Sequence, residues 1–348
     1  MSKKKTDRNH FLPKVYLKKW NLQNTDKSKT YLYCYDYKND KFEKNSFVKS
    51  KDELDLNDKL FQDKIYSQIF EDELSKIENN YNRWLNDIEN FYKFSENKTI
   101  SEAINSEEFK NLFMSFTKST LNMVYFAFVQ WVRYKPEERY ILFDIFKDIL
   151  LDDKTEYSEL FSEDALKFNN ITGVPVTIFT MDKTDKDIYK YPFKFINPEK
   201  LLSFHSTKYQ IIIDYSSEGN FITTNNPVTP MFSNSDILPY GMVFSLSTQF
   251  ALRINTKESI TKKDELLPII YPSKCTDNDV KRMNLTLIAN NPNSKIITGN
   301  KELALNLCKG INSSVLSEIH SEIIKRCESI KEKITEDTLF LDLSKEGY

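Results

Sequence analysis

The chain has 348 residues, enough for one large domain or two ordinary ones, and either can bury a hydrophobic core. Its 49 lysines and arginines nearly balance 51 aspartates and glutamates, so net charge gives no general argument for binding nucleic acid or an anionic membrane. The four cysteines are widely spaced and there are three histidines, which argues against a zinc cage and favours reduced thiols in the cytoplasm. We therefore expect no metal, no cofactor and no membrane partner.

The first twenty residues form a basic arm with seven lysines and arginines against one acidic residue, Asp7. No apolar segment follows the lysines, so the arm does not resemble a secretory signal. A solvated arm and a contact with phosphate or RNA both fit this charge pattern. After Pro13, the apolar residues Tyr16, Leu17 and Trp20 fit one face of a short helix.

Alternating tyrosines between residues 31 and 37 predict a strand, and Asn39-Asp40 followed by Phe42 predicts a hairpin. The tyrosines could pack in the core or stack on nucleic-acid bases. Residues 58–94 return to helical spacing, with several carboxylates on the helix, Glu73 and Glu78 among them.

The longest apolar stretch predicts a buried helix that begins after the N-cap Ser106 and ends near Tyr134, because Pro136 excludes the helical conformation just before it. Polar residues interrupt the stretch, so we interpret it as a core helix rather than a membrane span. Gln130 and Arg133 share one face of this helix. A buried guanidinium needs a carboxylate or an anionic ligand, and Glu73 or Glu78 is a candidate partner for Arg133.

The second half of the chain changes character near Gly173. Short apolar or β-branched runs predict strands, expected to be antiparallel, and further helices are predicted upstream and downstream. The expected strands are 174–180, 209–215, 220–224, 242–246, 250–254 and 295–298, and the expected helices are 136–151, 156–168, 276–289 and 313–335. The last helix carries an apolar stripe that either docks on the body or forms a homodimer seam.

These elements predict an α+β fold: a helical N-terminal half with a small hairpin, an antiparallel sheet in the C-terminal half and a long C-terminal amphipathic helix. The expected organisation is a basic arm with an H-x-x-P motif at 1–20, one domain at 21–335 and a tail at 336–348. Within that domain, residues 58–168 are helical, 174–298 sheet-rich and 313–335 a helix.

Common enzyme signatures are missing from the sequence. Six glycines form neither a phosphate-binding loop nor a dinucleotide fingerprint, and no GxSxG or HExxH motif occurs. His205 and His320 have no suggestive neighbours, whereas His10 lies beside Pro13 and the basic residues of the arm. Composition and spacing alone therefore assign no reaction.

Three motifs occur in order along the chain. The first is His10-Phe-Leu-Pro13 followed by Tyr16-Leu17, the second runs from Gln130 through Arg133 to Pro136, and the third is Asn225-Asn226-Pro227-Val228 after a strand. This combination resembles a bacterial family known as domain of unknown function 4238, and the likeness spans most of the chain. The sequence departs at Asn225, where the family usually has Asp, and at Phe244-Ser245, where Pro is more usual.

The resemblance groups His10, Gln130, Arg133 and Asn225 but does not say what these residues do. Two interpretations stay open. In the first, the chain is an intracellular bacterial effector of toxin or phage-defence type that acts on RNA or another phosphate-bearing substrate. His10 would be the general acid or base, Arg133 would hold the phosphate, and Gln130 and Asn225 would orient it. The predicted substrate-binding residues are Lys14, Tyr16 and Asn226.

In the second interpretation, the chain is a non-catalytic binding or interaction module. The same polar residues would then form a structural network that ties the N-terminal motif to the central helix and the sheet. Both interpretations predict that His10, Gln130, Arg133 and Asn225 meet.

Overall fold

A computed structural model covers the whole chain, and structure is described for these parts of it: residues 13–20, 32–36, 41–45, 64–96, 106–134, 209–224, 226–232, 239–256, 270–289, 296–298 and 300–308, with the single positions 318, 321 and 325. The described elements combine helices with two sheets, as the predicted α+β class requires.

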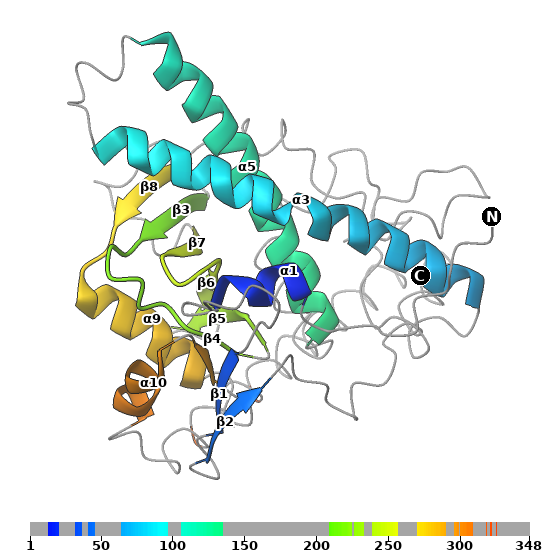
Figure 1. Cartoon of the computed structure of the whole chain (residues 1–348), viewed down its shortest axis with the longest axis vertical. Coiled ribbons are helices and arrows are strands. Elements are labelled where there is room, and N and C mark those ends of the chain that lie inside the picture. The colour runs from blue at the N-terminus through cyan, green and yellow to red at the C-terminus, as the bar shows by residue number, and fades with distance from the viewer. Residues whose placement is uncertain are drawn as a thin grey trace, which may run out of the picture.

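The larger sheet has five strands in the order β5-β6-β7-β3-β8 (Figure 1). Most neighbours are antiparallel, but β8 runs parallel to β3, which corrects the expectation of a wholly antiparallel sheet. The strands are β3 (Tyr209–Tyr215), β5 (Val228–Phe232), β6 (Pro239–Ser245), β7 (Phe250–Thr256) and β8 (Ile270–Lys274).

This sheet has two chemically different faces, because successive side chains of a strand point to opposite sides. The pairing register places Ile211 and Ile213 of β3 on the same face as Leu252 and Ile254 of β7, and this face is apolar. The other face, which we call the polar face, carries Gln210, Asp214, Thr229, Ser245, Arg253, Asn255, Tyr271 and Ser273.

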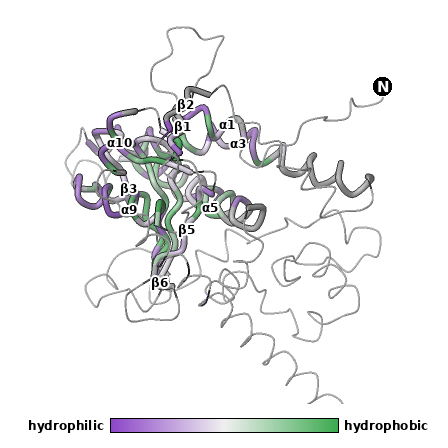
Figure 2. The backbone as a smooth tube through the Cα atoms, turned by 90° about the horizontal axis from the view of Figure 1, so that it is seen from below, coloured by the Kyte–Doolittle hydropathy of each residue, from purple (hydrophilic) through white to green (hydrophobic). Residues whose placement is uncertain are grey.

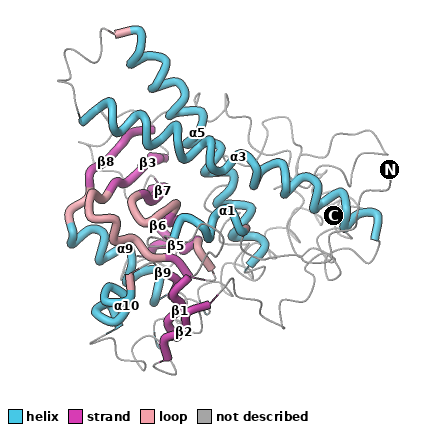
Figure 3. The backbone as a smooth tube through the Cα atoms, viewed as in Figure 1, coloured by secondary structure: helices cyan, strands magenta, loops and turns pink. Residues whose placement is uncertain are grey.

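Two long helices cover the apolar face, α3 (Lys64–Glu96) and α5 (Glu107–Tyr134) (Figures 1 and 3). They run antiparallel, because Phe91 stacks on Phe116 at a centroid distance of 4.5 Å while Tyr81 meets Phe126 at 4.9 Å. As predicted, Ser106 caps α5: its hydroxyl accepts a hydrogen bond of 3.0 Å from the backbone N–H of Phe109. The helix also ends at Tyr134, as predicted.

The short helix α1 (Lys14–Leu17) continues into the 3-10 turn η1 (Lys18–Trp20) and packs on α3. The predicted apolar face is confirmed, since Tyr16, Leu17 and Trp20 are all buried while Lys18 is exposed. Aromatic side chains from α1, α3, α5 and β6 therefore form one core around Tyr16.

A smaller sheet of order β2-β1-β9-β4 lies beside this core. The predicted hairpin is confirmed: β1 (Leu32–Asp36) and β2 (Lys41–Asn45) pair antiparallel. The remaining strands are β4 (Thr223–Thr224) and β9 (Ile296–Thr298). Tyr35 is buried in a second core cluster with Ile222 and Ile296, which favours core packing over base stacking at this position.

Two later helices, α9 (Asp277–Ala289) and α10 (Lys301–Cys308), complete the described structure. Helix α9 packs against β4 and β5, and its Asn284 side chain accepts a hydrogen bond from the N–H of Ile222 and donates one to the carbonyl of Asn220. Hydrophobic residues follow the strands of the sheet, whereas α9 and α10 carry many hydrophilic ones (Figure 2).

Several predicted elements lie outside the described residues, namely the helices 136–151 and 156–168 and the strand 174–180. The full length of the predicted helix 313–335 is not shown, although Glu318, Ser321 and Lys325 are helical and exposed. A homodimer through this segment stays a prediction. Among the described helices, none is long and apolar enough to cross a membrane.

Candidate functional site

Gln130, in the last turns of α5, is almost completely buried, with 2% of its surface exposed. Neither its amide nitrogen nor its amide oxygen hydrogen-bonds to any residue in the described part of the chain. Arg133 follows in the same helix, but its side chain lies outside the described residues. The first predicted site residue is therefore enclosed and polar, with unused hydrogen-bonding capacity.

Asn226 lies in the connection between β4 and β5 and is fully buried. Its backbone is held locally, since its N–H donates to the Thr224 hydroxyl at 3.2 Å and that hydroxyl donates to the Asn226 carbonyl at 2.6 Å. Its side-chain amide is in the same state as that of Gln130, with no partner for either atom among the described residues. The backbone hydrogen bonds therefore hold in place a carboxamide that has no hydrogen-bond partner among the described residues.

The contacts along α5 indicate the end of the helix–sheet interface to which each carboxamide belongs. Phe116 lies near Tyr92, which packs on β3 and β7, whereas Phe126 lies 5.8 Å from Phe244 of β6. Helix α5 thus crosses the sheet toward β5, with which it also packs (Figure 1). Gln130, one turn beyond Phe126, and Asn226, two residues before β5, consequently belong to the same end of this helix–sheet interface.

Tyr16 occupies a different environment from the one predicted for a substrate-binding residue. It is fully buried, its ring stacks on Phe244 at 5.4 Å, and its hydroxyl donates to the Ser245 carbonyl at 2.8 Å and lies 2.6 Å from the Thr223 hydroxyl. Burial raises the pKa of its phenol well above the ordinary value, although the hydrogen bond from Thr223 opposes that shift. Tyr16 therefore fastens α1 to β4 and β6 as a neutral core residue.

The remaining predicted site residues are not placed. His10 and Asn225 lie outside the described residues, and the side chain of Lys14 does as well, although its backbone begins α1. The expected meeting of His10 with Arg133, and an ion pair of Arg133 with Glu73 or Glu78, stay predictions. We use the name motif site for Gln130 and Asn226 together with the motif residues His10, Arg133 and Asn225.

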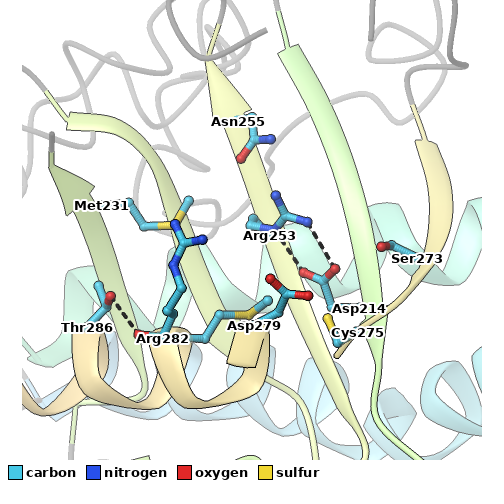
Figure 4. Close-up of a pocket in the computed structure, with 10 residues that line it drawn as sticks. Asp214, Met231, Arg253, Asn255, Ser273, Cys275, Asp279, Arg282 and Thr286 are labelled. Atoms are coloured by element: carbon cyan, nitrogen blue, oxygen red, sulfur yellow. Dashed lines mark hydrogen bonds and ion pairs between the residues drawn. The ribbon is translucent and has the colours of Figure 1, made fainter. Parts of the chain in front are cut away.

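A pocket on the polar face of the larger sheet was missed by the sequence reasoning (Figure 4). It is a cavity of about 320 Å³ between α9 and the strands, and we call it the α9 pocket. Its lining residues are Asp214, Met231, Arg253, Asn255, Ser273, Cys275, Asp279, Arg282, Met283 and Thr286. The available signal was the polar alternation inside predicted strands, where Asp214 and Arg253 interrupt apolar runs.

A bidentate ion pair forms the base of the α9 pocket (Figure 4). The Arg253 Nε and Nη2 atoms donate to the two Asp214 oxygens at 2.9 and 3.0 Å. Asp214 is fully buried, whereas 27% of the Arg253 side chain is exposed. Burial by itself disfavours the charged guanidinium, but the bonds to Asp214 outweigh it and raise the pKa of Arg253, so the charge is permanent.

The cysteine of this pocket is not an activated nucleophile. Burial, followed by the adjacent Asp214 carboxylate, raises the pKa of the Cys275 thiol well above its ordinary value. The thiol is therefore neutral at neutral pH, when a reactive cysteine would be ionised. Among the residues that the structure describes, no three histidine, cysteine or carboxylate side chains are arranged to hold a metal ion.

A family model described as "Protein of unknown function (DUF4238)" matches residues 8–302. The chain belongs to this family. The match spans all three motifs and both sites, so the resemblance drawn from those motifs is confirmed. No curated protein and no solved structure gives a match to the chain. Membership of DUF4238 names no reaction, and the grouping of the motif residues stays a prediction.

Proposed function

We propose that this chain is an intracellular bacterial effector, of toxin or phage-defence type, that acts on RNA or another phosphate-bearing substrate at the motif site. His10 serves as general acid or base, Arg133 holds the phosphate, and Gln130, Asn225 and Asn226 orient it. Tyr16 supports the site from the core and does not contact the substrate, because its hydroxyl is already engaged inside the protein.

One observation carries this proposal: Gln130 and Asn226 are two buried carboxamides that no described residue satisfies. Leaving a buried polar group without a partner costs about 1–3 kcal/mol. A carboxamide has both donors and an acceptor, so a ligand with phosphate oxygens and hydroxyl groups can satisfy it. Both residues belong to the family motifs, which connects the unused hydrogen-bonding capacity to function rather than to chance.

The charge of the neighbouring motif residues favours a phosphate. Arg133 follows Gln130 by three residues in α5, so both start from the same side of the helix. A guanidinium keeps its charge at all relevant pH values and binds phosphate oxygens in a bidentate manner. The seven basic residues among the first twenty add a positive arm that would attract RNA.

A second function, a non-catalytic interaction module, is favoured by the bonds of Tyr16. This motif residue links α1 to strands more than 200 positions away, through Thr223 and Ser245. If the polar groups of the other motif residues also bond within the protein, as the Tyr16 hydroxyl does, the motifs encode a structural network and no reaction. The two functions make opposite predictions for the stability of a Gln130 variant.

The test compares the wild-type chain with His10→Ala, Gln130→Leu and Thr120→Val. Thr120 is a matched control, because its buried hydroxyl on α5 also lacks a partner among the described residues but lies outside the motifs. Cleavage and binding of a fluorescent RNA oligonucleotide are measured together with urea denaturation. The proposal expects Gln130→Leu to keep or raise stability and to lower RNA cleavage by about tenfold or more, with His10→Ala inactive and Thr120→Val unchanged.

Two results would reject the effector function with RNA as its substrate. The first is an absence of RNA cleavage and binding by the wild-type chain. The second is a Gln130→Leu variant that loses about 1–3 kcal/mol of stability, since this shows that the carboxamide bonds within the protein itself. Circular dichroism confirms that each variant is folded before activity is compared.

A further inference from the structure

The α9 pocket contains guanidinium N–H donors that have no acceptor among the described residues. Asp214 engages the Nε and Nη2 atoms of Arg253, and the Nη1 amino group has no acceptor among the described residues. Arg282 reaches into the pocket from the exposed side of α9, and no described residue accepts a hydrogen bond from its guanidinium (Figure 4). Two guanidinium groups from different elements thus face one cavity.

The two carboxylates of the pocket differ in how strongly they engage the arginines that a ligand would need. Both oxygens of Asp214 are engaged by Arg253 at the buried base. Asp279 lies at the start of α9, where the backbone N–H and the hydroxyl of Thr276 donate to it. These bonds lower its pKa, and the positive charges of Arg282 and Arg253 lower it as well. Asp214 is therefore a support that fixes the orientation of Arg253, and Asp279 is a helix-capping residue at the rim.

Neutral polar and apolar groups complete the lining. Asn255 lines the pocket and is buried, with 9% of its surface exposed. The hydroxyl of Ser273 adds a further donor, while Met231 and Met283 supply apolar surface. A cavity of about 320 Å³ is at the lower end of the range for small-molecule sites, which is about 300–1,000 Å³.

We propose that the α9 pocket binds a small molecule through an oxyanion group, either a carboxylate or a phosphate, held between Arg253 and Arg282. Asn255 orients the oxyanion, and the two methionines contact a short apolar part of the ligand. Two arginines and two aspartates line the pocket, so its formal charge is zero and it suits a singly charged ligand better than a polyphosphate.

The α9 pocket and Gln130 of the motif site lie on opposite faces of the larger sheet. Asp214, Arg253 and Asn255 belong to the polar face, whereas Gln130 comes from α5 on the apolar face, so the sheet stands between them. Figure 4 shows α9 in front of the strands and the long helices behind them. The inference therefore does not depend on the proposed action on RNA.

The experiment titrates the full-length protein with inorganic phosphate and, separately, with acetate, while NMR follows the arginine side-chain N–H signals. We expect saturable shifts of the Arg253 and Arg282 signals at millimolar concentrations of at least one of the two anions. The anion that binds identifies the oxyanion class. Tetramethylammonium chloride serves as the cationic probe and is expected to give no shift.

A matched pair of variants tests specificity, Arg282→Gln and Lys281→Gln. Both residues are exposed neighbours on α9 and both substitutions remove one positive charge, but only Arg282 lines the pocket. Arg282→Gln should weaken anion binding by about tenfold, equal to about 1.4 kcal/mol, and Lys281→Gln by less than about twofold. Equal effects of the two variants would reveal non-specific attraction and overturn the site. So would an absence of shifts with both anions, or a stronger response to the cation.

Discussion

The hydroxyl of Tyr16 offers a direct test of how the N-terminal motif is joined to the sheet. It donates to the Ser245 carbonyl, and because a phenol has one hydrogen, the Thr223 hydroxyl must be the donor in the contact of 2.6 Å. Tyr16→Phe removes both interactions without changing the ring, which stays stacked on Phe244. The substitution therefore isolates the polar connection from the aromatic packing.

The stability cost of Tyr16→Phe depends on which hydrogen bonds Thr223 and Ser245 can still make after the substitution. Thr223 can still donate to the Thr224 carbonyl, a longer contact of 3.4 Å, so its loss is small. The Ser245 carbonyl loses this donor inside the core and accounts for most of the cost. We expect Tyr16→Phe to lower the free energy of unfolding by about 1–3 kcal/mol.

Urea denaturation followed by tryptophan fluorescence measures this value, since Trp20 is buried beside Tyr16. Thr223→Val in the Tyr16→Phe background should cost less than Thr223→Val alone, with a coupling energy of about 0.5–1.5 kcal/mol. Tyr81→Phe is the matched control: its hydroxyl donates to the Leu246 carbonyl, so it should show no coupling to Thr223. A Tyr16→Phe cost below about 0.5 kcal/mol, or strict additivity with Thr223→Val, would refute the reasoning.

Two further predictions concern the core and its response to pH. Gly241→Ala should lower stability by at least about 2–3 kcal/mol in urea denaturation, because the new Cβ would lie 2.2 Å from the Ile254 carbonyl oxygen; wild-type stability would contradict this. Burial raises the pKa of Tyr16, Tyr81 and Tyr92 above the ordinary value of 10.0, so the folded chain keeps protons that the unfolded chain loses above this pH. Their stabilising contribution is complete below pH 10 and falls above it by about 1.4 kcal/mol per pH unit for each phenol. Tyr81→Phe should reduce the loss of stability above pH 10 by about 1.4 kcal/mol per pH unit. An unchanged pH dependence would show that the Tyr81 phenol ionises freely in the folded protein.

The elements that local patterns predicted well are those whose own residues decide their structure. Ser106 and Tyr134 bound α5 as expected, because a capping hydroxyl and a following proline act within a few residues. Strand β3 also has the predicted limits, since a run of isoleucines between polar turns identifies it. The hairpin β1–β2 follows from alternation and a polar connection.

The elements that were missed depend on partners far away in the sequence. Strand β5 was not predicted; it contains Pro230, and a position at the edge of the sheet tolerates proline. Strand β8 contains Pro272 and also lies at an edge, and its parallel pairing with β3 has no local signal. Sequence periodicity predicts which side chains of a strand share a face, but it does not predict which strands pair with one another.

The candidate sites divide in the same way. Gln130 could be selected from the sequence because it shares a helix face with Arg133 in one of the three motifs, and it is buried in the structure. Tyr16 was also selected, but the sequence could not show that its hydroxyl is used inside the core. The α9 pocket was not found, since Asp214 and Arg253 become partners only when β3 and β7 pair.

Stability alone does not explain the chemistry of the polar face. A buried ion pair often contributes no more than apolar residues of the same volume would, because two charges must leave water. The aromatic core lies on the apolar face, and neither Asp214 nor Arg253 belongs to it. A bidentate aspartate does have one clear effect, which is to fix the plane of a guanidinium whose remaining amino group faces a cavity. Fixing a charged donor before the ligand arrives reduces the entropy lost on binding, and this is the advantage that a binding site gains from such a pair.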